Sequence, residues 1–179
     1  MDGPSTVEPE FPLVLAFARM AADHGWSLAT LRSFCRQRQI SDAERRRRWP
    51  RGVRSLGWQL NAYADLETLS DWTSNGSPSL YELIMRRFEA NEPLKLSVKR
   101  LAVSDLLHPV DTVLRTIETA RLFWRCRKVR PPGSSLAITV KTGMLVALYS
   151  AAVLVWLGDK PPAYRRLRPI VRFTEWILG

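Results

Sequence analysis

The sequence has very few residues of the types that build metal sites and disulfide frameworks. Its 179 residues include two cysteines, Cys35 and Cys126, and two histidines, His24 and His108. Two cysteines cannot form a disulfide scaffold, and we expect two buried, reduced thiols. The histidines are too few and too isolated for a metal site, and each lies at the expected end of a helix, where a capping role is more typical. The sequence therefore predicts no metal and no cofactor.

The short motifs of common catalytic sites are also missing. The chain has no glycine-rich phosphate loop, no Cys-x-x-Cys pair, no His-Glu-x-x-His and no Gly-x-Ser-x-Gly. Its carboxylates, such as Glu82 and Glu89, are scattered over expected helix surfaces, which favours solvated faces over acid–base catalysis. We therefore predict no catalytic residues and a protein that is not an enzyme. An enzyme is kept as a third alternative that no motif supports.

No segment has the pattern of a targeting peptide or of a long membrane span. The N-terminus lacks the basic region of a signal peptide. The most conspicuous apolar stretch, Gly143 to Leu157, holds fifteen residues without a charge. A helix of that length spans about 22 Å, less than the roughly 30 Å of a hydrocarbon core. We interpret the run as a buried core helix and expect a cytoplasmic protein, with peripheral contact to the inner membrane surface left open.

Basic residues are abundant. The chain has 27 Lys and Arg against 17 Asp and Glu, which gives a formal net charge of +10, while 46% of its residues are hydrophobic. The hydrophobic fraction is that of an ordinary globular protein. The excess charge favours contact with phosphate-bearing surfaces, either nucleic acid or anionic lipid.

The hydrophobic periodicity predicts an all-α fold of about nine helices. The expected ranges are 11–24, 27–37, 41–49, 52–70, 77–92, 94–107, 110–128, 136–157 and 163–178. Ser27, Ser41 and Ser77 are the expected N-caps of the second, third and fifth helices. Pro169 is expected to kink the last helix or to end its first half. The polar segment 71–77 separates a predicted domain 1–70 from a second domain, 77–179.

Arginine is concentrated between residues 36 and 54, where eight arginines stand against one aspartate and one glutamate. Arg45 to Arg48 form an unbroken run, and on a helix four consecutive residues point in directions about 100° apart, so they cannot all face one groove. The run is either a solvated face or a phosphate-binding surface for DNA or anionic headgroups. The candidate contact residues are Arg36, Arg38, Arg45, Arg46, Arg47 and Arg48.

The expected helices 77–92, 110–128 and 136–157 have wide apolar faces. Solid core packing explains most of these residues. A ligand cavity between the helices is the alternative, and the sequence does not separate a filled core from a hollow one.

The first four expected helices resemble the helix-turn-helix unit of TetR-type regulators. The segment 41–50 (SDAERRRRWP) occupies the position of their ten-residue recognition segment. This resemblance implies a DNA-binding repressor in which a dimer places two arginine-rich helices in successive major grooves.

Three other segments resemble a family with the same overall fold, the TetR-like lipid-binding accessory proteins of coenzyme Q (ubiquinone) biosynthesis. The segments are 49–56 (WPRGVRSL), 80–93 (LYELIMRRFEANEP) and the long apolar stretch 140–159 that ends in VWLGD. Within the second segment, Met85 to Phe88 is the most specific match. With His24 to Trp26 closing the first helix, the resemblance covers most of residues 11–178.

This second resemblance implies a non-enzymatic homodimer that holds an isoprenoid or related lipid in an apolar cavity of its C-terminal domain. It further implies that the protein assists a quinone-biosynthesis hydroxylase at a membrane. The candidate lipid-binding residues are Ile84, Phe88, Leu114, Ile117, Trp124, Met144 and Leu148. The dimer is expected to form through ranges 136–157 and 163–178, with Trp156, Phe173 and Trp176 as candidate contacts, although inward packing is the default expectation for each. A lipid-binding protein of this type is the leading hypothesis, and a TetR-like repressor is the alternative.

Overall fold

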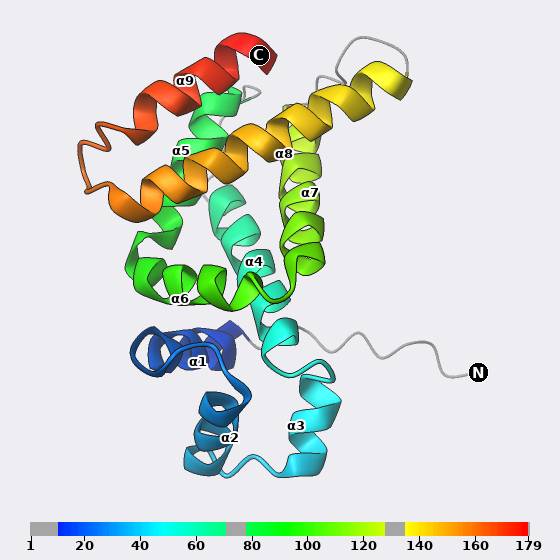
Figure 1. The fold of residues 1–179 in the computed structure, drawn as a ribbon, viewed down its shortest axis with the longest axis vertical. Coiled ribbons are helices and arrows are strands. Elements are labelled where there is room, and N and C mark those ends of the chain that lie inside the picture. The colour runs from blue at the N-terminus through cyan, green and yellow to red at the C-terminus, as the bar shows by residue number, and fades with distance from the viewer. Residues whose placement is uncertain (1–10, 71–77, 128–134, 179) are drawn as a thin grey trace. The chain divides into compact units, whose positions relative to one another are not determined.

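The computed structural model describes residues 11–70, 78–127 and 135–178, and all regular secondary structure in these ranges is helical. The α-helices are α1 (Phe11–His24), α2 (Leu28–Gln37), α3 (Asp42–Arg48), α4 (Val53–Leu69), α5 (Leu80–Asn91), α6 (Lys95–Asp105), α7 (Pro109–Cys126), α8 (Ser135–Gly158) and α9 (Leu167–Leu178), and a 3-10 turn, η1 (Glu92–Leu94), joins α5 to α6 (Figure 1). The predicted all-α class is therefore confirmed.

The predicted caps of α2 and α3 are confirmed. The Ser27 hydroxyl accepts a hydrogen bond from the Thr30 amide at 3.1 Å, and the Ser41 hydroxyl accepts one from the Glu44 amide at 3.2 Å. Each bond satisfies one of the amides that a helix leaves unpaired in its first turn.

Two predicted helix starts are wrong. The helix α5 is capped by Ser79, which forms a capping box with Glu82, and the expected cap Ser77 lies outside the described residues. The helix α9 begins at Leu167 rather than near residue 163. Pro169 therefore falls in the first turn, where its missing N–H has no carbonyl to bond and no kink results.

The contacts divide the chain into two compact units, and the first is built on α1. It comprises the described residues of Met1–Tyr63 together with Leu94–His108, so that α6 packs against α1, whereas the sequence analysis placed α6 in the second domain. The reason is Trp26, which is buried and donates from its indole nitrogen to the Ser97 carbonyl at 2.9 Å. The Phe17 ring packs edge-on against Trp26 and Phe34, with centroids 5.1 and 5.6 Å away.

The second unit comprises Ala64–Pro93 and Pro109–Gly179, and its described helices pack around an aromatic centre. Phe88 of α5 stacks on Tyr149 of α8, with ring centroids 5.6 Å apart, and Trp156 lies 5.3 Å from the same Phe88 ring. The Trp156 indole donates to the Glu92 carboxylate at 2.8 Å, which satisfies its one polar atom. The interior between α5, α8 and α9 is therefore filled with side chains. Trp156 is buried in this core, which agrees with the default expectation of inward packing and excludes it as a dimer contact.

The helix α8 differs most from expectation, because it is longer and much less buried than a core helix. In Figure 1 it runs across α5 and α7. Its 24 residues extend about 36 Å. Within the described part of the chain it is a helix long and apolar enough to cross a membrane by length and composition alone, with a mean hydropathy of 1.8, and 17% of that stretch is buried. Most of its apolar surface is thus available to a partner.

Candidate functional site

An open groove lies between α7 and α8 in the second unit. Its volume is about 1210 Å³, above the roughly 300–1,000 Å³ of a typical small-molecule site. The lining residues are Val113, Ile117, Glu118, Arg121, Trp124 and Arg125 of α7, with Ile138, Thr139, Thr142, Gly143 and Val146 of α8. The wall is therefore mostly apolar, with its charges confined to α7.

Helical spacing explains why these residues share one surface. On α7, Val113, Ile117 and Arg121 follow one another at intervals of four, and Trp124 is three residues further on. On α8, Ile138, Thr142 and Val146 repeat the interval of four. The lining therefore combines one stripe from each helix. Gly143 lies between Thr142 and Val146 and has no side chain to narrow the groove. The space beside it is open, because a Cβ placed there would meet nothing within 4 Å.

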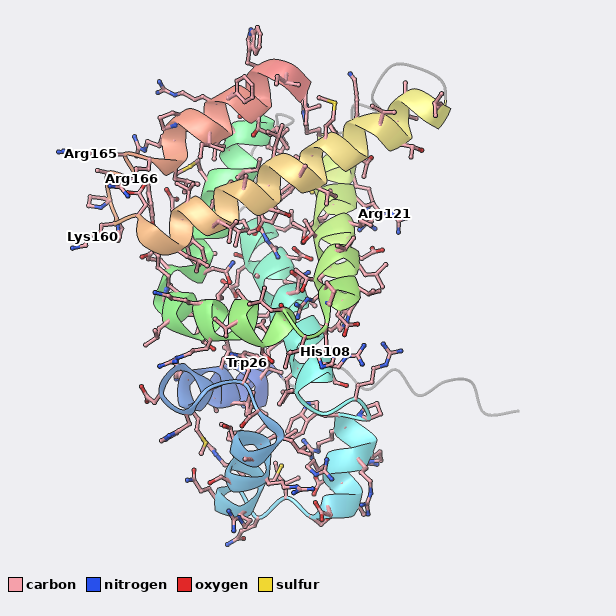
Figure 2. All side chains as sticks on the ribbon, in the orientation of Figure 1. Trp26, His108, Arg121, Lys160, Arg165 and Arg166 are labelled. Carbon is pink, nitrogen blue, oxygen red and sulfur yellow. The ribbon has the colours of Figure 1, made fainter. Side chains whose placement is uncertain are left out.

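The polar atoms of the groove are mainly donors. Arg121 donates to Glu118 at 2.7 Å, so the one carboxylate of the lining already has a partner. Figure 2 shows Arg121 projecting outward from α7. The Trp124 indole N–H is buried and has no hydrogen-bond partner among the described residues. An unsatisfied buried donor costs about 1–3 kcal/mol. Because this nitrogen has no exposed surface, a ligand oxygen would satisfy it only after the indole turns toward the groove.

A buried polar network behind the groove fixes the relation of α5, α7 and α8. Arg87 of α5 is 3% exposed; its Nε donates to the Tyr149 hydroxyl of α8 at 2.8 Å, and its Nη1 pairs with the Asp65 carboxylate. The Thr119 hydroxyl of α7 donates to the same carboxylate at 3.4 Å. Burial disfavours the charged guanidinium, but Tyr149 and Asp65 outweigh it and raise the pKa of Arg87. The cation is therefore retained inside the unit.

The residues predicted to bind lipid are split by the structure. Ile117 and Trp124 line the groove. Leu114 and Met144 are exposed on the same two helices, and Leu148 is half-buried.

Ile84 and Phe88 are buried in the packed core and take no part in the groove lining. The sequence analysis missed Arg121, Arg125 and the α8 stripe. The interval-of-four pattern on both helices was the signal that could have found them.

Two of the four arginines in the α3 run form ion pairs, and the other two are exposed. Arg45 pairs with Asp42 at 3.1 Å, and Arg48 pairs with Glu44, both within one turn of the helix. Arg46 and Arg47 are exposed, as are Arg36 and Arg38 near the end of α2. The first and last members of the run are thus ion-paired and the middle two are exposed, which agrees with the prediction that the four cannot all face one groove.

A second basic surface lies at the turn between α8 and α9. Figure 2 shows Lys160, Arg165 and Arg166 projecting from this turn. On α9, Phe173 is 49% exposed and Trp176 is 80% exposed, and their rings stack with centroids 6.0 Å apart. Two large exposed aromatic side chains on the helix that follows this basic turn indicate a surface that contacts another molecule.

The cysteines have no features of a reactive site. Burial raises the pKa of Cys35 and of Cys126, which disfavours the nucleophilic thiolate. In the ranges that the structure describes, no three His, Cys, Asp or Glu side chains cluster as metal ligands would. The groove is thus the site with the clearest capacity for a ligand.

Comparisons with known proteins do not assign the chain to a family. No protein-family model matches it, and neither a curated protein nor a solved structure is significantly similar to it.

The buried network yields a stability prediction. We expect Arg87→Met to lower the free energy of unfolding by about 3 kcal/mol, because the substitution leaves the Asp65 carboxylate without its guanidinium partner. The measurement is urea denaturation followed by circular dichroism. The exposed Arg172→Met is the control and should lose less than about 0.5 kcal/mol.

The double variant Arg87→Met with Asp65→Leu tests the cause, because it removes both charges and should recover much of the loss. If the single Arg87 variant were as stable as the wild type, the network would not hold these helices together.

Proposed function

We propose that this protein is a non-enzymatic lipid-binding protein whose ligand lies in the α7–α8 groove. The observation that carries the proposal is the groove itself, which offers a long apolar wall and a buried indole donor without a partner. Burial of a hydrocarbon chain contributes about 0.8 kcal/mol per methylene, so ten buried methylenes provide about 8 kcal/mol, the scale of micromolar affinity.

The resemblance to the ubiquinone-biosynthesis accessory family gives this binding a role. In that role the ligand is an isoprenoid quinone precursor, and the protein presents it to a hydroxylase. The fold would be the TetR-like bundle. Arg87 and Phe88 belong to the segment that resembles the family most specifically. They form the polar and aromatic centre of the second unit, and this structural role would explain why the segment resembles the family.

An anionic membrane surface is the natural source of such a lipid. The cations at the α8–α9 turn and the exposed Phe173–Trp176 pair fit this surface better than the α3 run, in which Arg45 and Arg48 are ion-paired. Each basic residue near an anionic membrane contributes about 1 kcal/mol.

Blocking the groove tests lipid binding directly. Native mass spectrometry of the purified wild-type protein should detect a co-purifying lipid. Val146→Trp places an indole in the groove and should reduce lipid occupancy by about tenfold or more, since a filled groove cannot bury the chain. Val103→Trp on α6 is the matched control, because Val103 is an exposed valine of the first unit, and it should retain the lipid.

A wild-type protein that carries no lipid, and that does not take up added isoprenoid or fatty acyl chains, would contradict the proposal.

The outward face of α8 supports a homodimer. The exposed residues of this face repeat at intervals of three and four and are apolar: Leu136, Val140, Met144, Ala147, Ala151 and Leu154. Two of them, Ala147 and Ala151, are small and would allow a second helix to approach closely. We propose that two copies of the chain cover this face around a two-fold axis.

Analytical ultracentrifugation tests the dimer. The wild type should sediment with twice the 20.5 kDa mass of one chain. Leu154→Glu should shift the population to monomer, because it buries a charge at the interface. The matched control is Val103→Glu, since Val103 is similarly exposed on a different helix, and it should remain dimeric. A monomeric wild type would exclude this interface.

DNA binding is the second candidate function, and the exposure of Arg36, Arg38, Arg46 and Arg47 favours it. These four side chains come from the end of α2 and from α3, the elements that correspond to a helix-turn-helix in the TetR-like interpretation. Arginines on such a surface would contact phosphates and position the protein on a duplex.

Salt-dependent binding to duplex DNA tests this candidate. A repressor should prefer one sequence, and its affinity should fall steeply with salt. The double variant Arg46→Gln with Arg47→Gln should make the slope of log K against log salt shallower by about 1.8, because each phosphate contact contributes about 0.9. Arg165→Gln with Arg166→Gln is the control pair and should leave the slope unchanged. Binding that is indifferent to sequence would remove the repressor function.

A further inference from the structure

The polar part of the α7–α8 groove is built to receive negative charge. Arg121 and Arg125 line it, and its one carboxylate, Glu118, is already paired with Arg121. A third guanidinium, that of Arg127, lies over the Trp124 ring with its carbon 5.9 Å from the ring centroid. Arg127 also donates to the Leu178 carbonyl at 3.3 Å. Asp65, which attracts Arg125, is itself paired with Arg87, so the arginines of this part of α7 outnumber the nearby carboxylates.

The unpaired indole belongs to the same groove lining as Arg121 and Arg125, and its ring contacts Arg127. The Trp124 N–H adjoins Arg125 in sequence, and it can only donate a hydrogen bond. An oxygen atom with a negative charge satisfies such a donor and the neighbouring guanidinium at the same time. A hydroxyl group of a neutral lipid could accept from the indole, but it would not use the excess positive charge.

The charges and the apolar wall lie toward different ends of α7. Trp124 and Arg125 are in its last turn, whereas Val113 is in its first half, about 16 Å away along the helix axis. Ile117 and the α8 residues Ile138 and Val146 continue the wall. This arrangement suits an amphiphile with a polar head at one end and a chain along the groove.

We propose that the groove selects a lipid with an oxyanion headgroup, a carboxylate or a phosphate monoester, whose oxygens are held by Trp124, Arg125 and Arg121. The inference rests on the proposed lipid-binding function and makes it specific: acidic amphiphiles are the ligand class, and neutral lipids of the same chain length bind more weakly.

Titration calorimetry with matched ligands tests the headgroup. Dodecanoate, dodecyl phosphate and dodecanol share one chain, and each is used below its micelle concentration. The two anions should bind wild-type protein at least about tenfold more tightly than the alcohol, a difference of about 1.4 kcal/mol. Arg125→Gln should reduce this ratio, because it weakens binding of the two anions more than binding of dodecanol. Trp124→Phe should weaken all three ligands, because the indole can also donate to the alcohol, and it should weaken the anions most.

Arg121→Gln is a further variant at an exposed position, where folding is not at risk, and it should also reduce the ratio. Arg172→Gln removes an exposed arginine of α9 outside the groove lining and should keep the ratio at its wild-type value.

The outcomes distinguish the inference about the headgroup from the proposed lipid-binding function. Equal binding of anions and alcohol would overturn the headgroup inference and leave the lipid-binding function standing. No binding of any of the three ligands would overturn both. Inorganic phosphate that competes at the same concentration as dodecyl phosphate would show a site for free anions and overturn the assignment to acidic lipids.

Discussion

The second unit depends on one buried cation. Arg87 carries its charge into an interior where an unpaired guanidinium would cost several kcal/mol. It is tolerated because Asp65 and Tyr149 supply acceptors from α4 and α8, and because Thr119 of α7 bonds to the same carboxylate. Hydrogen bonds are directional and short, so these four side chains restrict how far the helices can shift past one another. Apolar contacts alone would allow more freedom.

The position of α8 follows from this restriction. One side of the helix enters the aromatic centre through Leu145, Tyr149 and Trp156. The side toward α7 forms the groove, and the outward face remains uncovered. A single uninterrupted apolar helix thus supplies a core, a proposed ligand wall and a proposed dimer surface. This division explains why its composition is apolar on every side although little of it is buried within one chain.

The basic regions on α3 and along the groove differ in how much of their charge is available. On α3, half of the run is neutralised within the helix by Asp42 and Glu44. Along the groove, one of the two lining arginines is matched by Glu118, and one further cation, Arg127, contacts the Trp124 ring. Electrostatic attraction to phosphate-like groups is common to the lipid-binding and the DNA-binding proposals. Only the groove combines it with an apolar wall, which is why lipid binding has the stronger support.

The sequence by itself determined the all-helical class and the caps at Ser27 and Ser41. It also determined that only some of the α3 arginines point outward. These features depend on neighbours within four residues. It did not determine the start of α9 or the place of α6, which depend on contacts with residues distant in the chain, such as the bond from Trp26 to Ser97. The groove was partly visible, since Ile117 and Trp124 share a helical stripe. Apolar periodicity cannot distinguish a stripe that enters a core, as Ile84 and Phe88 do, from one that faces a groove or a second copy. Only the tertiary structure decided that, through the polar contacts that fix which side of each helix is buried.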